Sequence, residues 1–387
     1  MKDLDIYLSP LGIDNWESPD EGSKWKDHVS VYTETFPDLA NVKIAIIAVK
    51  EIRGSEFDSS DNPMDVDSIR KYLSHLEWYE HFPQVADLGD ILPGNELADT
   101  YFALQTVIQE LVKRDIIPIV IGGSQDLTYA QYKGYESLEQ LVNLVTIDYK
   151  IDIGEVEDEM NSGNYISSII SHQPNFLFNY SNLGHQTYFN SEKKLRLISK
   201  MFFEALRLGE ISQDVKFSEP LIRNADLVSF DLKSIKSYYL PGNILPMPNG
   251  IDGEQACQIM WYAGLSDKLS SIGLYGFNND EKSIGAQLIA QMIWYFVEGY
   301  ANRKEDYPKS NLKKYLKYTI QINDSEHELV FYKSPKSDRW WVEIPYPDGK
   351  EARYFRHLIV PCSYEDYQLA SSGEMPDIWW QTYQKLI

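Results

Sequence analysis

The stretch Asn143–Gly154 constrains the fold of this chain more than any other. It begins with an apolar, β-branched run, Leu144–Ile147, of the kind found in strands buried on both faces of a parallel sheet. The run ends in charges at alternate positions, Asp148, Lys150 and Asp152. Open α/β sheets bind ligands beyond the carboxyl ends of their strands. We therefore expect these charged side chains to point into a functional site.

Strand-like and helix-like segments alternate through most of the chain. Besides the stretch above, strands are predicted at Val42–Val49, Ile116–Ile121, Asn182–Thr187, Leu227–Asp231 and Ser270–Tyr275. Helices are predicted at Asp65–Glu77, Asn95–Arg114, Tyr129–Gln140, Ser191–Ala205, Gly253–Tyr262 and Ile284–Gly299, and Asp87–Asp90 is predicted to be a short segment and turn. Such alternation indicates a three-layer α/β/α domain, a doubly wound parallel sheet with helices on both faces.

The character of the sequence changes after Gly299. Short aromatic and β-branched runs follow, separated by turn-rich segments, at Tyr318–Ile322, Glu328–Tyr332, Trp340–Ile344 and Arg353–Val360. This spacing predicts antiparallel hairpins, and a Trp379-Trp380 segment closes the chain. We place a boundary near residue 305. The predicted organisation is an N-terminal cap segment (1–40), an α/β domain (41–305) and an aromatic-rich C-terminal β extension (306–387).

Composition narrows the class of protein. The formal net charge of −22 over 387 residues argues against unaided binding to nucleic acid or anionic membranes, which are polyanions. Two cysteines, Cys257 and Cys362, are too few for a disulfide framework and suit a reducing compartment. The N-terminus lacks the pattern of a signal peptide, and no apolar run approaches the ~18–20 residues that span a bilayer. We expect a cytoplasmic protein without membrane insertion.

Several motifs, taken in order, resemble the ureohydrolase family, which comprises arginase, agmatinase and formiminoglutamase. Gly122–Gln125 resembles the family's Gly-Gly-Asp-His-Ser segment, and Asp148–Asp152 its Asp-Ala-His-x-Asp segment. Ser229–Lys233 resembles its Ser-x-Asp-x-Asp segment, and Ser162–Asn164 an arginase-type substrate loop. The resemblance covers roughly residues 40–300 and implies an arginase-like α/β/α fold.

The resemblance also implies which residues correspond to the family's ligands for two manganese ions. These positions are Gln125, Asp148, Lys150, Asp152, Asp231 and Lys233. Three aspartates survive, whereas Gln125 and Lys150 stand where the family has histidine, and Lys233 stands where it has aspartate. Among the former substrate-site positions, Ser162, Gly163 and Asn164 survive, and Gly276 stands where the family has a glutamate.

An ammonium group has no lone pair for a metal and repels a cation. Three carboxylates beside two lysines leave the cluster near neutral without metal, so Lys150 and Lys233 can act as internal counter-charges. We therefore expect no metal and no other cofactor, and interpret Asp148, Asp152 and Asp231 as a buried salt-bridge cluster rather than ligands.

Two hypotheses about function follow. The first is a catalytically inactive ureohydrolase-like protein, a pseudoenzyme, that acts as a scaffold, complex subunit or ligand sensor. The alternative is a formiminoglutamase- or arginase-like hydrolase of C–N bonds in linear amidines or guanidines, with an altered manganese site. No catalytic or cofactor-binding residue is assigned under the first.

Two kinds of partner are compatible with the sequence, another protein and further copies of this chain. The aromatic residues of the extension could form a protein-binding surface, and packing of the extension on the main domain explains them equally well: Trp340, Trp341, Tyr346, Tyr354, Phe355, Trp379 and Trp380. The resemblance also leaves room for a homo-oligomer.

Overall fold

The structure is a computed structural model that describes residues 4–12, 22–57, 64–154, 158–308, 312–322, 328–345 and 354–386. A 10-stranded sheet has the order β1-β4-β3-β5-β10-β9-β6-β7-β8, with β2 also paired to β4. Its strands are β1 (Leu8–Ser9), β2 (Ser30–Val31), β3 (Ile44–Val49), β4 (Val85–Ile91), β5 (Ile117–Gly122), β6 (Val142–Ile147), β7 (Leu177–His185), β8 (Glu204–Arg207), β9 (Leu227–Asp231) and β10 (Ser271–Tyr275). All are parallel to their neighbours except β1, which is antiparallel to β4.

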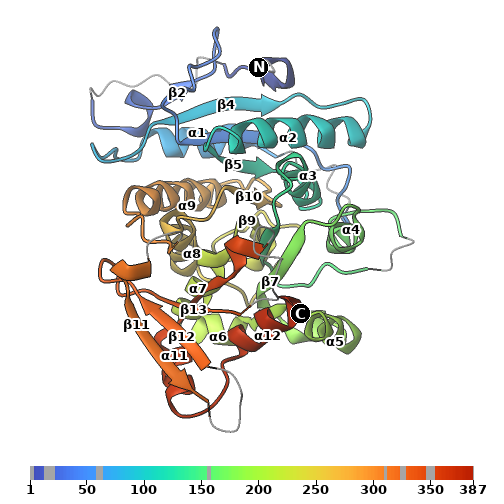
Figure 1. The fold of residues 1–387 in the computed structure, drawn as a ribbon. Coiled ribbons are helices and arrows are strands. Elements are labelled where there is room, and N and C mark those ends of the chain that lie inside the picture. Colours follow the sequence, from blue (N-terminus) through green and yellow to red (C-terminus); the bar gives the residue numbers. More distant parts are fainter. Residues whose placement is uncertain are drawn as a thin grey trace.

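Helices cover both faces of this sheet, as the alternation predicted (Figure 1). They are α1 (Val66–Ser74), α2 (Leu97–Val112), α3 (Leu127–Lys133), α4 (Tyr165–Ser171), α5 (Glu192–Lys200), α6 (Leu208–Gln213), α7 (Glu219–Asn224), α8 (Gly253–Leu265) and α9 (Ile284–Ala301). Strand β3 shows why the sheet needs cover on two sides. Ile44 and Ile46 join the core beneath α1, α8 and α9, whereas Ala45 and Ile47 join the core beneath α2 and α3.

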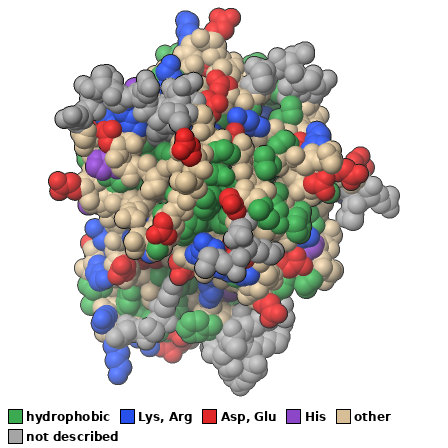
Figure 2. All heavy atoms as spheres, turned by 90° about the horizontal axis from the view of Figure 1, so that it is seen from above, with side chains coloured by type: hydrophobic (Ala, Val, Ile, Leu, Met, Phe, Trp, Pro, Cys, Tyr) green, Lys and Arg blue, Asp and Glu red, His purple; other side chains and the backbone are tan. Residues whose placement is uncertain are grey.

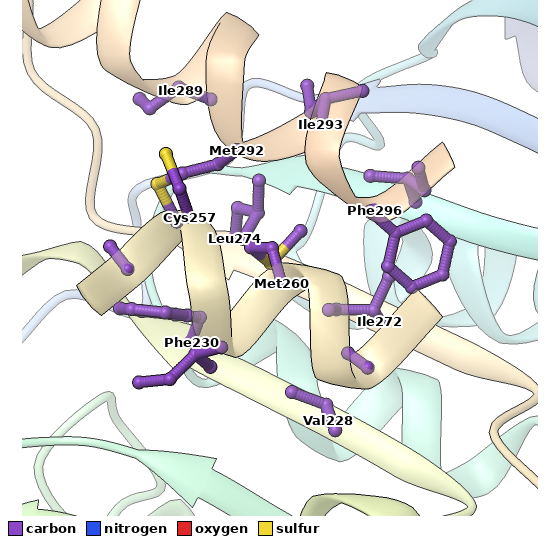
Figure 3. Close-up of a cluster of buried hydrophobic side chains, with 14 of the residues drawn as sticks. Val228, Phe230, Cys257, Met260, Ile272, Leu274, Ile289, Met292, Ile293 and Phe296 are labelled. Atoms are coloured by element: carbon purple, nitrogen blue, oxygen red, sulfur yellow. The ribbon is translucent and has the colours of Figure 1, made fainter. Parts of the chain in front are cut away.

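The largest core lies between β9, β10 and the helix pair α8–α9. Figure 3 shows Phe230 of β9 and Leu274 of β10 facing Met260 of α8 and Met292 of α9. The two helices approach closely because glycines meet at their crossing. A Cβ on Gly264 would lie 2.1 Å from the carbonyl oxygen of Phe296. This packing makes the centre of the sheet a rigid support for the loops beyond its strands.

The prediction of a short segment and turn at Asp87–Asp90 is wrong, because these residues lie inside β4. Its acids are tolerated in a strand because Arg70 of α1 neutralises them. Arg70 Nε lies 2.9 Å from Asp87 Oδ2, and Nη1 lies 2.7 Å from Asp90 Oδ1. Gly89 has a φ of +82°, and a Cβ there would lie 2.1 Å from the carbonyl oxygen of Ser9 on β1. Contacts with Arg70 and with β1 therefore fix the conformation of this segment.

Other boundaries also differ from expectation. The helix predicted to reach Ala205 ends at Lys200, and β8 follows it. Strand β7 begins at Leu177, five positions before the predicted start at Asn182 by residue number. Helices α4, α6 and α7 were not predicted; each has seven residues or fewer, too short for a clear apolar repeat.

The C-terminal extension forms the predicted antiparallel sheet, of four strands, but also contains helices. Its elements are β11 (Leu316–Gln321), β12 (Glu328–Lys333), β13 (Trp340–Glu343), β14 (Ile359–Cys362), α11 (Tyr364–Ser371) and α12 (Asp377–Leu386). The strand predicted from Arg353 begins at Ile359, after a 3-10 turn at Phe355–His357, and Arg353 itself lies outside the described residues. The Trp379-Trp380 segment is helical, within α12.

Buried polar contacts attach this extension to the main domain. The Arg223 guanidinium of α7 donates to the carbonyl oxygens of Trp340 (3.1 Å) and Cys362 (3.2 Å). From the extension, Arg356 Nη2 lies 2.6 Å from Oδ1 of Asp226, the residue before β9. Loss of either contact would leave a buried charge or carbonyl group unsatisfied.

The predicted aromatic surface of the extension divides into two groups. Trp340 and Trp379 are buried in the core of the extension, and Trp341 is buried against Arg223 of the main domain. Phe355 and Trp380 are 57% and 42% exposed. Tyr354 packs against the extension's own core, and Tyr346 lies outside the described residues. Only part of the aromatic set is therefore available to a partner.

The molecular surface mixes charges of both signs. Seen from above, acidic and basic side chains are interspersed among apolar and neutral ones (Figure 2). Of the helices in the described ranges, none has the length and apolar character needed to cross a membrane.

Candidate functional site: an acid–lysine cluster at the carboxyl ends of β6 and β9

Two central strands bring the predicted site residues together. Strands β6 and β9 are parallel neighbours in which Ile147 pairs with Phe230. The next residues, Asp148 and Asp231, therefore emerge side by side at the carboxyl edge of the sheet. Asp152, in the loop after β6, is also buried, with 4% of its surface exposed. The structure thus places these three acids at one edge of the sheet.

The carboxyl groups of Asp148 and Asp152 form a coupled pair. Burial, followed by the charges of Asp152 and Asp231, raises the pKa of Asp148 well above its ordinary value. Burial also raises the pKa of Asp152, to about 6, while its hydrogen bond with Asp148 and the nearby lysines lower it. Burial and the neighbouring acids thus favour a proton on Asp148 over one on Asp152.

The ammonium group of Lys150 lies closer to Glu56 than to the aspartates of the cluster. Its ammonium lies 2.7 Å from Glu56 Oε2 and 2.8 Å from Glu56 Oε1, but 3.8 Å from Asp152 Oδ1. The backbone N–H of Lys150 donates to Asp148 Oδ1 at 2.9 Å. Glu56 belongs to the loop after β3, which reaches over the cluster. Lys150 therefore joins this loop to the acids.

Lys233 is the second ammonium of the cluster. Its Nζ lies 3.4 Å from Asp231 Oδ2, and its backbone N–H donates to Asp231 Oδ1 at 3.0 Å. Burial lowers and the charges of Asp231, Asp148 and Asp152 raise the pKa of Lys233, and the balance lies above its ordinary value. The ring of Phe57 lies 5.3 Å from the ammonium. Lys233 is therefore charged at neutral pH.

Gln125 follows β5 and contacts β9. Its Nε2 donates to Ser229 Oγ at 3.3 Å, and its buried Oε1 has no hydrogen-bond partner among the described residues. The side chain is thus held by the strand that carries Asp231.

The predicted substrate-site positions lie around the same cluster. A Cβ on Gly276 would lie 3.1 Å from Asp231 Oδ1, so a longer side chain at this position would begin beside the cluster. Ser162 Oγ accepts a hydrogen bond from the Glu56 N–H at 2.9 Å, and a Cβ on Gly163 would lie 2.5 Å from Glu56 Oε2. Asn164 instead faces its own loop, where Oδ1 accepts from the Asn161 N–H at 2.7 Å.

The donors at this site do not fit a pair of divalent ions. Ammonium groups occupy two of the six positions, and an amide occupies a third. Within the residues that the structure describes, no group of three or more histidine, cysteine, aspartate or glutamate side chains is arranged to hold a metal ion. The ammonium groups of Lys150 and Lys233 instead act as counter-charges to the carboxylates of Glu56, Asp152 and Asp231. The buried Oδ2 of Asp148 has no hydrogen-bond partner among the described residues.

Sequence reasoning missed Glu56 and Tyr165. Glu56 follows β3, so the rule that sites form beyond strand ends could have identified its loop, but nothing local pairs it with Lys150 across 94 residues. Among the described residues, the buried hydroxyl of Tyr165 has no hydrogen-bond partner, and burial followed by the charge of Asp152 raises its pKa. Nothing in the sequence around this tyrosine indicates that it lies beside the acids.

The fold and the site together define an α/β protein of the ureohydrolase type, with acids at the carboxyl ends of adjacent parallel strands. The model of the arginase family matches residues 45–297, and the chain belongs to that family.

Formimidoylglutamases are among the relatives with similar sequences. One from Geobacillus sp. (strain WCH70) is 25% identical over 198 residues, which cover 48% of this chain and 60% of that protein. One from Streptococcus gordonii is 23% identical over 305 residues, which cover 72% of this chain and 92% of that protein. The chain thus spans less than two thirds of the first of these relatives.

Solved structures support the same fold. The formimidoylglutamase of Bacillus subtilis has a TM-score of 0.64 at 14% identity, and the match covers 74% of this chain and 96% of that chain. The Trypanosoma cruzi formiminoglutamase with Mn²⁺ has a TM-score of 0.60 at 18% identity, covering 68% of this chain and 94% of that chain. At these identities the likeness establishes the arginase-like α/β fold.

Proposed function

We propose that this arginase-family protein does not carry out metal-dependent hydrolysis and acts as a scaffold, complex subunit or ligand sensor. One observation carries the proposal: the ammonium groups of Lys150 and Lys233 lie among the acids at positions where metal ligands are expected. Lys150 lies 2.7 Å from Glu56 and Lys233 lies 3.4 Å from Asp231. A divalent ion in the same space would face the positive charges of the buried Lys233 and the partly buried Lys150.

The chemistry of the remaining residues supports the proposal. Hydrolysis of an amidine needs a strong nucleophile, which a metal supplies by lowering the pKa of bound water to about 7. Among the chain's own groups, Asp152 is the candidate base, but Lys150 and Lys233 stabilise its charged form. Burial nevertheless raises the pKa of Asp152 to about 6, so this carboxylate could accept a proton from water, but it cannot supply the hydroxide that a bound metal provides.

The direct test combines metal analysis with an activity assay on the purified full chain. We expect less than stoichiometric manganese after growth with added manganese, and no release of formamide from N-formimino-glutamate or urea from arginine. A matched formimidoylglutamase, prepared and assayed in parallel, controls for metal loading. Stoichiometric manganese that is lost on chelation together with activity would refute the proposal.

The second candidate function is hydrolysis of C–N bonds in linear amidines, with an altered manganese site. The similarity to formimidoylglutamases over 305 residues favours it. Under this alternative, Asp148, Asp152 and Asp231 would bind the metal, and the lysines would have to move away from it. The same assay distinguishes the two candidates.

A restoration variant tests whether the site has been assigned to the correct residues. The triple variant Gln125→His, Lys150→His and Lys233→Asp is expected to bind manganese, because it supplies imidazole and carboxylate donors in place of an amide and two ammoniums. Calorimetric titration with manganese measures the stoichiometry, and circular dichroism checks the fold. The single variant Gln125→His, which keeps both lysines, is the control and is expected to bind none. A folded triple variant without manganese binding would contradict the assignment.

The exposed aromatic residues of the extension are the proposed contact with a protein partner. Phe355 and Trp380 remain available for this role because they are exposed.

A further inference from the structure

A cavity lies beyond β7 and β8, at the same carboxyl edge of the sheet as the acid–lysine cluster. Its volume is about 770 Å³, within the range of about 300–1,000 Å³ typical of small-molecule sites. The ends of β7 and β8, the start of α6 and the loop before α8 line it. Open α/β sheets bind ligands beyond the carboxyl ends of their strands, so the position of this cavity suits a ligand.

This cavity is separate from the acid–lysine cluster. None of the cluster's aspartates or its lysines Lys150 and Lys233 lines it. The wall between them is the segment after β7: the Gln186 N–H donates to the carbonyl oxygen of Tyr149 at 2.8 Å, and Gln186 Nε2 donates to that of Asn249 at 3.3 Å. A ligand here would therefore not displace the counter-charges.

Arg207 gives the cavity a positive charge without a matching acid. It is the last residue of β8, is exposed, and pairs in register with His185 of β7. In the described part of the chain, no carboxylate forms a salt bridge with its guanidinium. The other lining cation, Lys236, lies 2.6 Å from Asp252, and the lining acid Glu210 accepts the backbone N–H of Arg207 at 2.9 Å. Arg207 is thus the lining cation left for an anion.

His185 offers the cavity a hydrogen-bond acceptor. Its Nδ1 lies 3.2 Å from the carbonyl oxygen of Leu206, and a carbonyl oxygen can only accept, so Nδ1 carries the proton. Burial lowers the pKa of His185, so the ring is neutral at pH 7. Nε2 is then unprotonated and can accept a hydrogen bond from a hydroxyl or amino group.

We propose that this cavity binds a small organic anion whose carboxylate or phosphate pairs with Arg207 and whose hydroxyl or amino group donates to His185. A guanidinium forms two parallel hydrogen bonds with either type of anion. The aromatic side chain of Tyr188, which is 69% exposed at the rim, can cover the carbon skeleton of such a ligand. This inference does not rest on the proposed function, since binding is measured without reference to hydrolysis.

Calorimetric titrations of the full chain with malate, succinate and inorganic phosphate test this proposal at constant ionic strength. Malate and succinate differ by one hydroxyl, so malate is expected to bind more tightly. Arg207→Gln is expected to weaken binding of the preferred anion about tenfold or more, and Arg207→Lys by less. The control Arg196→Gln removes an arginine that is 69% exposed on α5 and should leave binding unchanged.

The outcomes decide between sources of the anion and can overturn the proposal. Preference for malate assigns a hydroxy-carboxylate ligand, and preference for phosphate assigns a phosphorylated one. Absence of saturable binding by all three probes, or equal affinities of wild type and the folded Arg207→Gln variant, would overturn it.

Discussion

Replacement of Lys233 by methionine is expected to lower the free energy of unfolding by about 3 kcal/mol. The substitution keeps an unbranched apolar stem but removes the ammonium that lies 3.4 Å from Asp231 Oδ2. Asp231 is 1% exposed, so water cannot replace the lost counter-charge. Urea denaturation followed by tryptophan fluorescence measures the change.

The loss is expected to depend on pH. Burial already raises the pKa of Asp231 in the folded protein, and removal of Lys233 raises it further. The folded variant therefore takes up a proton as the pH falls, so its stability deficit should be smaller at about pH 5 than at about pH 8. Adding Asp231→Asn to the variant should recover part of the loss by removing the unpaired charge.

A matched control for Lys233 is available. Lys236→Met breaks a pair with Asp252 in which the two side chains are 34% and 38% exposed, and should change stability by no more than about 1 kcal/mol. If Lys233→Met and this control lost the same amount at both pH values, Lys233 would not be the counter-charge of the cluster.

Replacement of Arg70 by methionine is expected to have the largest effect on the fold, a loss of about 4 kcal/mol. Arg70 is 2% exposed and joins α1 to β4 through Asp87 and Asp90. Its Nη2 also donates to the carbonyl oxygen of Gly89 at 3.1 Å. Without the guanidinium, Asp87 would remain buried and unpaired in the middle of a strand. The midpoint of urea denaturation, measured at constant slope, reports the loss.

Conservative and control variants sharpen this test. Arg70→Lys should recover only part of the stability, because an ammonium cannot form the two-pronged contact with Asp87. Arg196→Met, at an exposed helix pair with Glu192, should be close to neutral. A loss below about 1 kcal/mol for Arg70→Met would show that Asp87 becomes neutral or hydrated at little cost.

Local sequence predicted the fold where strands and helices are long and periodic. Val42–Val49 and Leu227–Asp231 are apolar and β-branched, and they form β3 and β9 with little change of boundary. The turn predicted at Asp87–Asp90 was wrong, because aspartate and glycine favour turns but here lie within a strand. The neutralising Arg70 is 17 residues away from Asp87, and no local pattern reveals the pairing.

The sequence by itself indicated a three-layer α/β/α domain, through its alternation of strand-like and helix-like segments, and charged side chains beyond the ends of its strands. The resemblance to ureohydrolases implied the arginase-like fold and the grouping of Lys150 and Lys233 with the three aspartates. Only the tertiary structure decided that Lys150 pairs chiefly with Glu56. It also revealed the cavity beside Arg207. Both depend on which distant loops fold over the sheet edge, and the free energy of those contacts is absent from any local segment.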